Sequence, residues 1–152
     1  MNSDRIKLIK DLAKPIIEKE DMYMLDVELK PGKETVVWIF VDAESGDVNV
    51  EACGRISREL GFVLDAHDSA SGRYRLNVSS PGLDRPLTDE RQYIKNIGRQ
   101  IHCKIGKEDT PEHVEGVLKS VSDRTIEVQT GEDDLRTVHL EIISEAKIIP
   151  QI

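Results

Sequence analysis

The histidines and cysteines are the first residues to test for metal or redox chemistry. The four histidines are His67, His102, His113 and His139. Their spacing matches no metal-binding motif, and the chain has neither His-Glu-x-x-His nor clustered Cys and His. The two cysteines, Cys53 and Cys103, are too isolated for a Cys-x-x-Cys site or a disulfide framework. The sequence therefore predicts no metal and no cofactor, and we expect both cysteines to be buried as small apolar side chains.

Ser79 and Ser80 are the candidate nucleophiles. No His or Lys has a motif spacing to them, and the Gly-x-Ser-x-Gly context that exposes a catalytic serine is absent. The ten glycines form neither Gly-x-Gly-x-x-Gly nor a phosphate-binding loop. We therefore expect a protein without catalysis; a small hydrolase that uses one of these serines is the enzyme alternative.

The charges are segregated along the chain. Its 152 residues include 21 Lys and Arg against 29 Asp and Glu, a formal charge of −8. Residues 1–72 hold 9 basic and 15 acidic residues (−6), residues 73–107 hold 8 and 3 (+5), and residues 108–152 hold 4 and 11 (−7). Affinity for nucleic acid comes mainly from Lys and Arg that neutralise phosphates. A contact with RNA must therefore be local.

The central basic segment supplies the candidate phosphate contacts, which are Arg73, Arg75, Arg85, Arg91, Lys95, Arg99 and Lys104. The alternative is that Arg75 pairs across strands with Asp26 or Glu28. In the same alternative, Arg91, Lys95 and Arg99 only solvate a helix face and its end. Arg85 lies between a turn and a proline, so holding this residue in position for a partner costs less conformational entropy. That position favours a binding role or an interdomain ion pair for Arg85.

Acidic residues gather in the last third of the chain. The candidates for contact with a partner are Glu108, Glu112, Glu132, Asp133, Asp134 and Glu141. Such a run is commonly no more than a solvated surface. The functional alternative is an acidic surface that steers a strongly basic protein through complementary electrostatic fields.

The first half of the chain predicts the order helix, strand, strand, helix, strand, over residues 3–19, 23–30, 35–41, 50–60 and 73–78. We expect Pro15 to kink the first helix, Asn49 to cap the second and Gly61 to end it. The strand at 35–41 is apolar on both faces, so both faces need cover. This pattern indicates an α+β domain that ends near residue 83. The order is similar to KH modules, although their Gly-x-x-Gly loop is absent.

The second half begins with a stiff connector, residues 79–87, in which Pro81 and Gly82 fit a type II turn. Thr88 is then expected to cap a short helix that ends near Asn96. Five strand candidates follow, at residues 101–105, 114–121, 125–130, 136–140 and 146–149. So many short strands in so short a segment indicate a small closed barrel. We expect two domains, residues 1–83 and 84–152.

The chain also lacks a run of about 18 apolar residues, and its first five residues, Met-Asn-Ser-Asp-Arg, lack the apolar core of a signal peptide. We therefore expect a soluble, cytoplasmic protein.

Residues 74–87, Tyr-Arg-Leu-Asn-Val-Ser-Ser-Pro-Gly-Leu-Asp-Arg-Pro-Leu, resemble the signature of the bacterial ribosome maturation factor family RimP. Further segments that fit the family pattern are residues 39–42, 53–60, 64–65, 98, 116–118 and 142–147. Asn77 stands where the family usually has Glu, so the local charge partner of this strand differs. The similarity extends over nearly the whole chain.

This resemblance implies an α+β N-terminal domain followed by a small Sm-like (SH3-like) β-barrel. It also implies a non-catalytic role in maturing the small ribosomal subunit, with the immature subunit, ribosomal RNA and a basic small-subunit ribosomal protein as partners, and no membrane or small-molecule substrate. The signature connector comprises Ser79, Ser80, Pro81, Gly82, Leu83, Asp84, Arg85 and Pro86. We expect the basic candidates to contact RNA and the acidic candidates to hold the ribosomal protein. A general protein-interaction module without RNA contact is the alternative.

Overall fold

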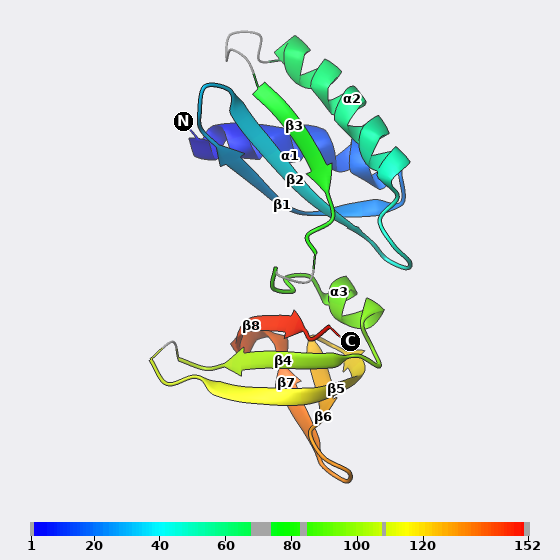
Figure 1. Ribbon diagram of the computed structural model, residues 1–152, viewed down its shortest axis with the longest axis vertical. Helices are drawn as coiled ribbons and strands as arrows, with labels where there is room; N and C mark the ends of the chain where they lie inside the picture. The colour runs from blue at the N-terminus through cyan, green and yellow to red at the C-terminus, as the bar shows by residue number, and fades with distance from the viewer. Residues whose placement is uncertain (1, 68–73, 83–84, 108, 151–152) are drawn as a thin grey trace. The chain divides into compact units, whose positions relative to one another are not determined.

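The structure is a computed structural model that describes residues 2–67, 74–82, 85–107 and 109–150 (Figure 1). The chain divides into two compact units, Met1–Pro81 and Gly82–Ile152. Each unit has its own cluster of buried apolar side chains. We describe each of them by itself.

The first unit has the element order predicted from the sequence. Its elements are α1 (Asn2–Glu18), β1 (Met22–Lys30), β2 (Thr35–Ala43), α2 (Val50–His67) and β3 (Tyr74–Ser79). The strand β2 lies in the middle of the sheet, antiparallel to β1 and parallel to β3. Parallel neighbours need a long crossover connection, and α2 supplies it between β2 and β3.

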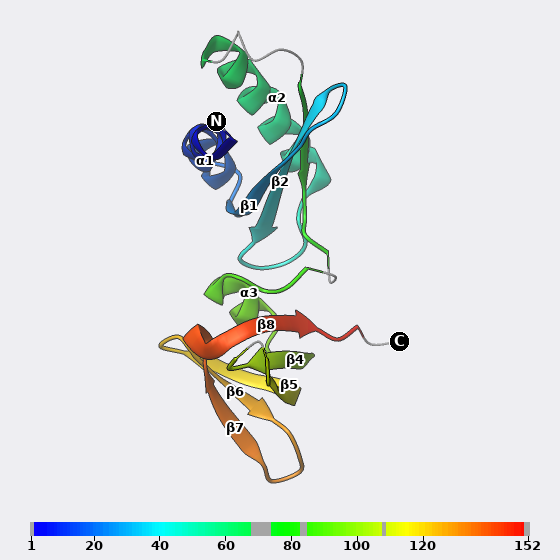
Figure 2. The same cartoon turned by 90° about the vertical axis from the view of Figure 1, so that its left-hand side faces the viewer.

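One face of this sheet packs against both helices (Figure 2). Val37, Ile39 and Val41 of β2 are at most 1% exposed and share a core with residues of α1 and α2. Trp38 and Phe40 alternate with them, so their side chains lie on the opposite face. The two helices cover one face, and on the opposite face Phe40 is buried at 9% exposed while Trp38 is half-buried.

The prediction that Gly61 ends the second helix is wrong, because α2 continues to His67. Leu64 is 5% exposed and extends the apolar stripe of α2 into the core beyond the glycine. The Tyr74 hydroxyl donates to the Gly61 carbonyl at 3.2 Å and lies 2.8 Å from Oδ1 of Asp65. Packing by these groups offsets the low helix propensity of glycine.

The start of α2 and the course of α1 follow from local hydrogen bonding. The Asn49 side chain accepts from the backbone N–H groups of Glu51 at 2.8 Å and Ala52 at 3.2 Å, so the predicted cap is confirmed. The helix α1 does not end at Pro15 but continues through it to Glu18. Pro15 is exposed, so water can satisfy the carbonyl that a proline leaves without its amide donor.

The second unit contains a short helix and one antiparallel sheet. The elements are α3 (Glu90–Lys95), β4 (Gln100–Ile105), β5 (Glu112–Ser122), β6 (Thr125–Gln129), β7 (Leu135–His139), the 3-10 turn η1 (Leu140–Ile142) and β8 (Ile143–Ile148). The five strands lie in the order β7-β6-β5-β4-β8. All five strands predicted from the sequence are therefore present, with ends shifted by up to three residues.

The helix α3 is capped one residue later than predicted, by Asp89 instead of Thr88. The Asp89 carboxylate accepts from the backbone N–H of Arg91 at 2.9 Å, while Oε1 of Gln92 accepts from the backbone N–H of Asp89 at 3.1 Å. This reciprocal capping box satisfies two donors that would otherwise lack partners at the helix start. The same Gln92 oxygen also accepts from the backbone N–H of Thr88 at 2.8 Å.

Gly116 marks a close approach between β5 and β6. A Cβ atom at this position would lie inside the van der Waals radii of the carbonyl group of Gln129 and at 3.0 Å from a methyl group of Val128. Only glycine fits here without displacing backbone.

Candidate binding surfaces

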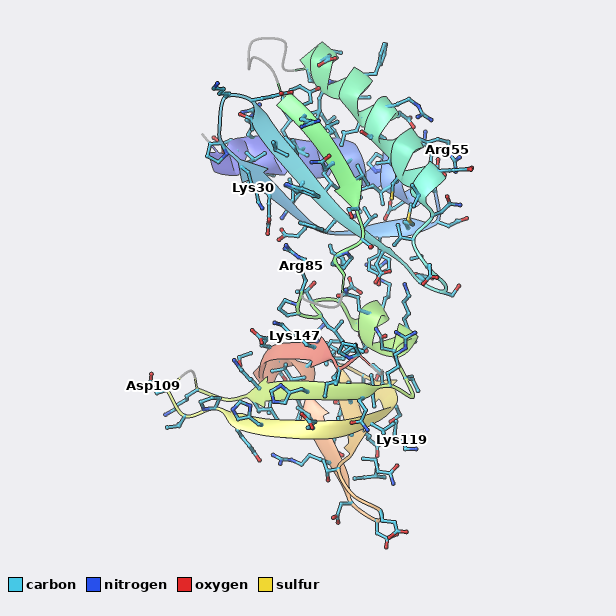
Figure 3. All side chains as sticks on the ribbon, viewed as in Figure 1. Lys30, Arg55, Arg85, Asp109, Lys119 and Lys147 are labelled. Carbon is cyan, nitrogen blue, oxygen red and sulfur yellow. The ribbon has the colours of Figure 1, made fainter. Side chains whose placement is uncertain are left out.

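Some of the predicted site residues fall on parts of the chain that the structure does not describe. Those outside the described residues are Arg73, Leu83, Asp84 and Glu108. The remaining candidates can be placed in one unit or the other, and one of them, Arg85, is labelled in Figure 3.

Arg75 lies exposed on β3, where its neighbour on the adjacent strand is Val36. Because β2 separates β3 from β1, Asp26 and Glu28 are not its cross-strand neighbours. The alternative of an adjacent-strand ion pair for Arg75 is therefore wrong. Within the described part of the chain, Arg75 takes part in no ion pair, so its guanidinium is available to a phosphate.

Arg91 is held by its own helix cap. Its Nε and Nη2 donate to the two carboxylate oxygens of Asp89 at 2.9 and 2.8 Å. This contact lowers the pKa of Asp89, an effect that partial burial opposes. Asp89 therefore already holds the Arg91 guanidinium, and a phosphate would have to displace this carboxylate.

Arg99, Lys95 and Arg85 differ in exposure. Arg99 is exposed just before β4, and its backbone carbonyl accepts from Leu118 N–H at 2.9 Å, which fixes this segment against β5. Lys95 ends α3 and is half-buried, as is Arg85 in the connector. Among the described residues Arg99 makes no ion pair, so it is the most accessible of the three.

Lys104 belongs to a basic cluster that the sequence reasoning did not find in full. Lys104 and Lys147 each lie 3.9 Å from Oε1 of Glu145, which is half-buried on β8. His102 pairs with Lys147 in the strand register, and its Nε2 lies 3.0 Å from Nδ1 of His113 on β5. We call His102, Lys104, His113 and Lys147 the β4 cluster.

The signal for the β4 cluster was present in the sequence but not used. Strand alternation alone places His102 and Lys104 on the same face of β4. The register that brings His113 and Lys147 beside them depends on which strands pair, and the sequence does not state this.

The acidic candidates differ in whether a basic side chain already binds them. Glu112 is bound by Arg136, whose two terminal nitrogens donate to it at 2.6 and 2.9 Å. The guanidinium lowers the pKa of Glu112. Glu141 is exposed in η1. The pair formed by Glu112 and Arg136 is solvated and adds little to stability.

Glu132, Asp133 and Asp134 come together, exposed, in the turn between β6 and β7. A groove of about 410 Å³ runs past Glu132, between β5 and β6, and a second one of about 510 Å³ is lined by Asp133 and Leu135. The Leu135 residue is 59% exposed. An extended basic segment with an apolar side chain would complement this acidic and partly apolar surface.

The structure describes the surroundings of the candidate nucleophile Ser79 and of the two cysteine thiols. The Ser79 hydroxyl donates to the Ser80 carbonyl at 3.1 Å. Both cysteines are buried, as predicted. Burial raises the pKa of the Cys103 thiol to about 11 and also raises that of Cys53, so both remain protonated near neutral pH.

The described residues contain no group of three or more His, Cys, Asp or Glu side chains able to hold a metal ion. No helix in the described ranges is long and apolar enough to span a membrane.

A comparison with known protein families identifies the first unit. Residues 12–84 match the RimP N-terminal domain. The matched segment runs from the middle of α1 through β3 and into the connector, so it includes the whole sheet of this unit. It also contains residues 74–84 of the segment 74–87 that suggested the family from the sequence. The chain thus carries the N-terminal domain of the RimP family, a family of ribosome maturation factors.

Proposed function

We propose that this protein matures the small ribosomal subunit in the cytoplasm by binding the immature subunit through both ribosomal RNA and a basic ribosomal protein, without catalysis. The observation that carries the proposal is the segregation of charge: a segment of +5 at residues 73–107 lies between segments of −6 and −7. A basic segment favours RNA phosphates and an acidic one favours a basic protein, so one chain can hold both partners.

We also propose that residues 1–83 and 84–152 are separate domains joined at residues 79–87, the first KH-like and the second a small Sm-like barrel. The two independent apolar cores support the division. The order of five antiparallel strands supports a small barrel.

Exposed cations support the RNA contact. Arg75 and Arg99 are exposed, and the β4 cluster adds Lys104 and Lys147. Arg91 contributes less, because Asp89 already holds its guanidinium. Contacts with phosphates fix position on RNA and carry no base specificity.

The acidic turn between β6 and β7 supports the protein contact. Glu132 and Asp133 of this turn line the grooves described above, and Leu135 adds exposed apolar surface. The carboxylates would attract a basic segment, while Leu135 would bury apolar area against it.

The test is cosedimentation of the tagged protein with purified immature and mature small subunits at two salt concentrations. We expect association with immature particles only, weakened at the higher salt concentration because ionic contacts are screened. Equal binding to mature subunits, or binding that salt does not change, would contradict the proposal.

A general protein-interaction module without RNA contact is the second candidate, and the protection of Arg91 by Asp89 favours it. The double variant Arg75→Glu, Arg99→Glu separates the two. We expect it to lose binding to immature subunits, whereas Arg58→Glu, an exposed residue of α2, should leave binding unchanged. If the double variant binds normally and is folded, the module without RNA contact is the better description.

A further inference from the structure

The strands β7 and β8 are the two edge strands of the sheet in the second unit (Figure 2). On the outer side of β8, the Ala146 carbonyl accepts from the Leu87 N–H at 2.7 Å, so the segment before α3 covers part of that edge. Within the described residues, β7 pairs with β6 alone and no other group bonds to its backbone. The outer edge of β7 is therefore open.

The register of the β6–β7 hairpin shows which residues of β7 face this open edge. The Thr130 N–H donates to the Asp134 carbonyl and the Leu140 N–H donates to the Arg124 carbonyl, both at 2.9 Å. Hydrogen-bonded and non-hydrogen-bonded pairs alternate in an antiparallel ladder, and the register between these two bonds has no shift. The residues that direct their backbone N–H and C=O groups away from β6 are consequently Leu135, Thr137 and His139.

This edge has the properties of a site for an added strand. A row of unpaired N–H and C=O groups is a template for pairing with another chain, and edge strands are commonly protected by Lys, Pro or a bulge. The sequence of β7, Leu-Arg-Thr-Val-His, has neither Lys nor Pro, and its register with β6 has no bulge. Its one arginine, Arg136, is bound to Glu112. The three N–H and three C=O groups of the edge are thus accessible to an extended segment as long as β7.

The side chains beside this edge favour a basic segment. Glu132, Asp133 and Asp134 directly precede β7 and are exposed, and in the described ranges no side chain binds their carboxylates. The groove beside Leu135 is lined by three carboxylates and one lysine, and Leu135 itself is 59% exposed. A segment that alternates basic and apolar residues would bring cations to the turn and bury apolar area against Leu135.

We propose that the outer edge of β7 binds an extended basic segment of a partner protein as an added strand. The inference rests on the proposed function for the class of partner, a basic ribosomal protein, and it specifies backbone pairing as the way in which that partner is held. A second copy of this chain fits the edge less well, because residues 108–152 carry a net charge of −7 and would repel their counterpart. Main-chain hydrogen bonds supply affinity in this mode, and the neighbouring side chains supply the preference for basic residues.

Amide hydrogen exchange of the isotope-labelled full chain, followed by NMR, reports on this edge directly. The probe is a peptide of alternating Lys and Val, longer than β7, with an acetylated N-terminus and an amidated C-terminus. Because β6 already holds the amides of Arg136 and Val138, the peptide should protect the other set, Leu135, Thr137 and His139. We expect their exchange to slow by about tenfold when the peptide occupies about 90% of the protein, since exchange then proceeds through the free fraction. A peptide of alternating Glu and Val should give no protection.

A backbone variant separates strand pairing from attraction by charge. Thr137→Pro removes the central outward N–H at an edge position where proline is tolerated, and should weaken the peptide by about tenfold. Thr137→Ala keeps this N–H and is the matched control. If Thr137→Pro does not fold, a peptide methylated on its backbone nitrogens measures the same loss on the unmodified protein. That peptide keeps its charges but lacks the donors, so it should bind about tenfold more weakly.

A charge variant tests the contribution of the acidic turn. Glu132→Gln combined with Asp133→Asn removes two of its charges and should weaken the peptide several-fold at low salt. Glu18→Gln combined with Asp11→Asn makes the same chemical changes on exposed residues of α1 and should have little effect.

Four results would overturn the inference. They are unprotected edge amides at saturating peptide, equal binding of the methylated and unmethylated peptides, equal effects of the two charge variants, and protection that rises with protein concentration without peptide. The last result would show that a second copy covers the edge. The proposed function fails separately, if the unmodified protein does not cosediment with immature subunits. Normal cosedimentation without protection of these amides would therefore remove only the added strand.

Discussion

At the scale of single residues, the cap of α3 links protonation to stability. Arg91 and the helix N-terminus stabilise the ionised carboxylate of Asp89, so its pKa in the folded protein lies below the ordinary value of 3.8. A carboxyl group with a lowered pKa contributes stability above its unfolded pKa and loses it as the pH falls through the folded pKa. The contribution is modest, because both side chains are partly exposed.

We therefore expect Asp89→Ala to lower the free energy of unfolding by about 1 kcal/mol at pH 7, through loss of the cap. The difference between the variant and the original protein should shrink as the pH falls below about 4, where Asp89 becomes protonated. Urea unfolding at several pH values measures this. Asp89→Asn retains an acceptor and is the control, and a difference that is constant with pH would contradict the assignment.

Gly116 illustrates a position where one methyl group decides stability. In Gly116→Ala the new Cβ would meet the backbone of Gln129, and backbone cannot move aside as a flexible side chain can. We expect a loss of about 1–3 kcal/mol, the usual cost of overpacking. The measurement is the urea midpoint of the variant.

The matched control for Gly116→Ala is Gly54→Ala, which makes the same change within α2. Its Cβ would have ordinary contact with Arg58 at 3.5 Å, and alanine favours the helix by up to about 1 kcal/mol. The two substitutions should shift the midpoint in opposite directions. A shift in the same direction for both would show that the approach of β5 to β6 can relax.

At the scale of secondary-structure elements, the packing of α2 explains why the end predicted for this helix at Gly61 was wrong. Sequence rules give glycine as a stop signal, but the helix continues because Leu64 reaches the core three residues later. Phe62, in the same stretch, is 79% exposed. The last turns of α2 are therefore stabilised through the helix face that carries Leu64 and not through the face that carries Phe62.

This predicts unequal effects of two truncations on α2. Leu64→Ala should lower the free energy of unfolding by about 2–4 kcal/mol, because it leaves a cavity in the core. Phe62→Ala should change it by less than about 0.5 kcal/mol, as expected of a surface position. Thermal unfolding followed by circular dichroism compares them, and equal effects would mean that Phe62 has a partner in solution.

The sequence could predict those features that are set by residues close to one another along the chain. Strand alternation and helix periodicity found every α-helix and strand but not the 3-10 turn η1, and the capping chemistry of Asn49 located the start of α2. Pairing between distant strands was not available from periodicity, so the parallel partner of β2 and the β4 cluster were missed. Arg91 was ambiguous for a different reason: Asp89 is close in sequence, but only the geometry of the cap shows that it holds the Arg91 guanidinium.

At the scale of the whole molecule, charge segregation makes a quantitative prediction about salt. If Arg75 and Arg99 each neutralise one phosphate, removing either should make the slope of log K against log salt shallower by about 0.9. Binding measured at four salt concentrations gives the slope for Arg75→Ala, Arg99→Ala and the control Arg58→Ala. An unchanged slope with weaker binding would mean that these residues do not contact phosphates.

The parallel pairing of β2 with β3 also has a consequence for the order in which the first unit folds. The strands β1 and β2 are joined by a short turn, whereas β3 can pair with β2 only after the chain of α2 has closed a long loop. Closing that loop lowers the entropy of the chain before the contacts between β2 and β3 can compensate for the loss. We expect β3 to dock late, so that Val78→Ala speeds unfolding and leaves the folding rate nearly unchanged, while Val27→Ala in β1 slows folding. Stopped-flow kinetics would measure both rates, and slower folding of Val78→Ala would reverse the order. On the expected order, the strand that carries the first six of the fourteen signature residues is the last part of its own sheet to form.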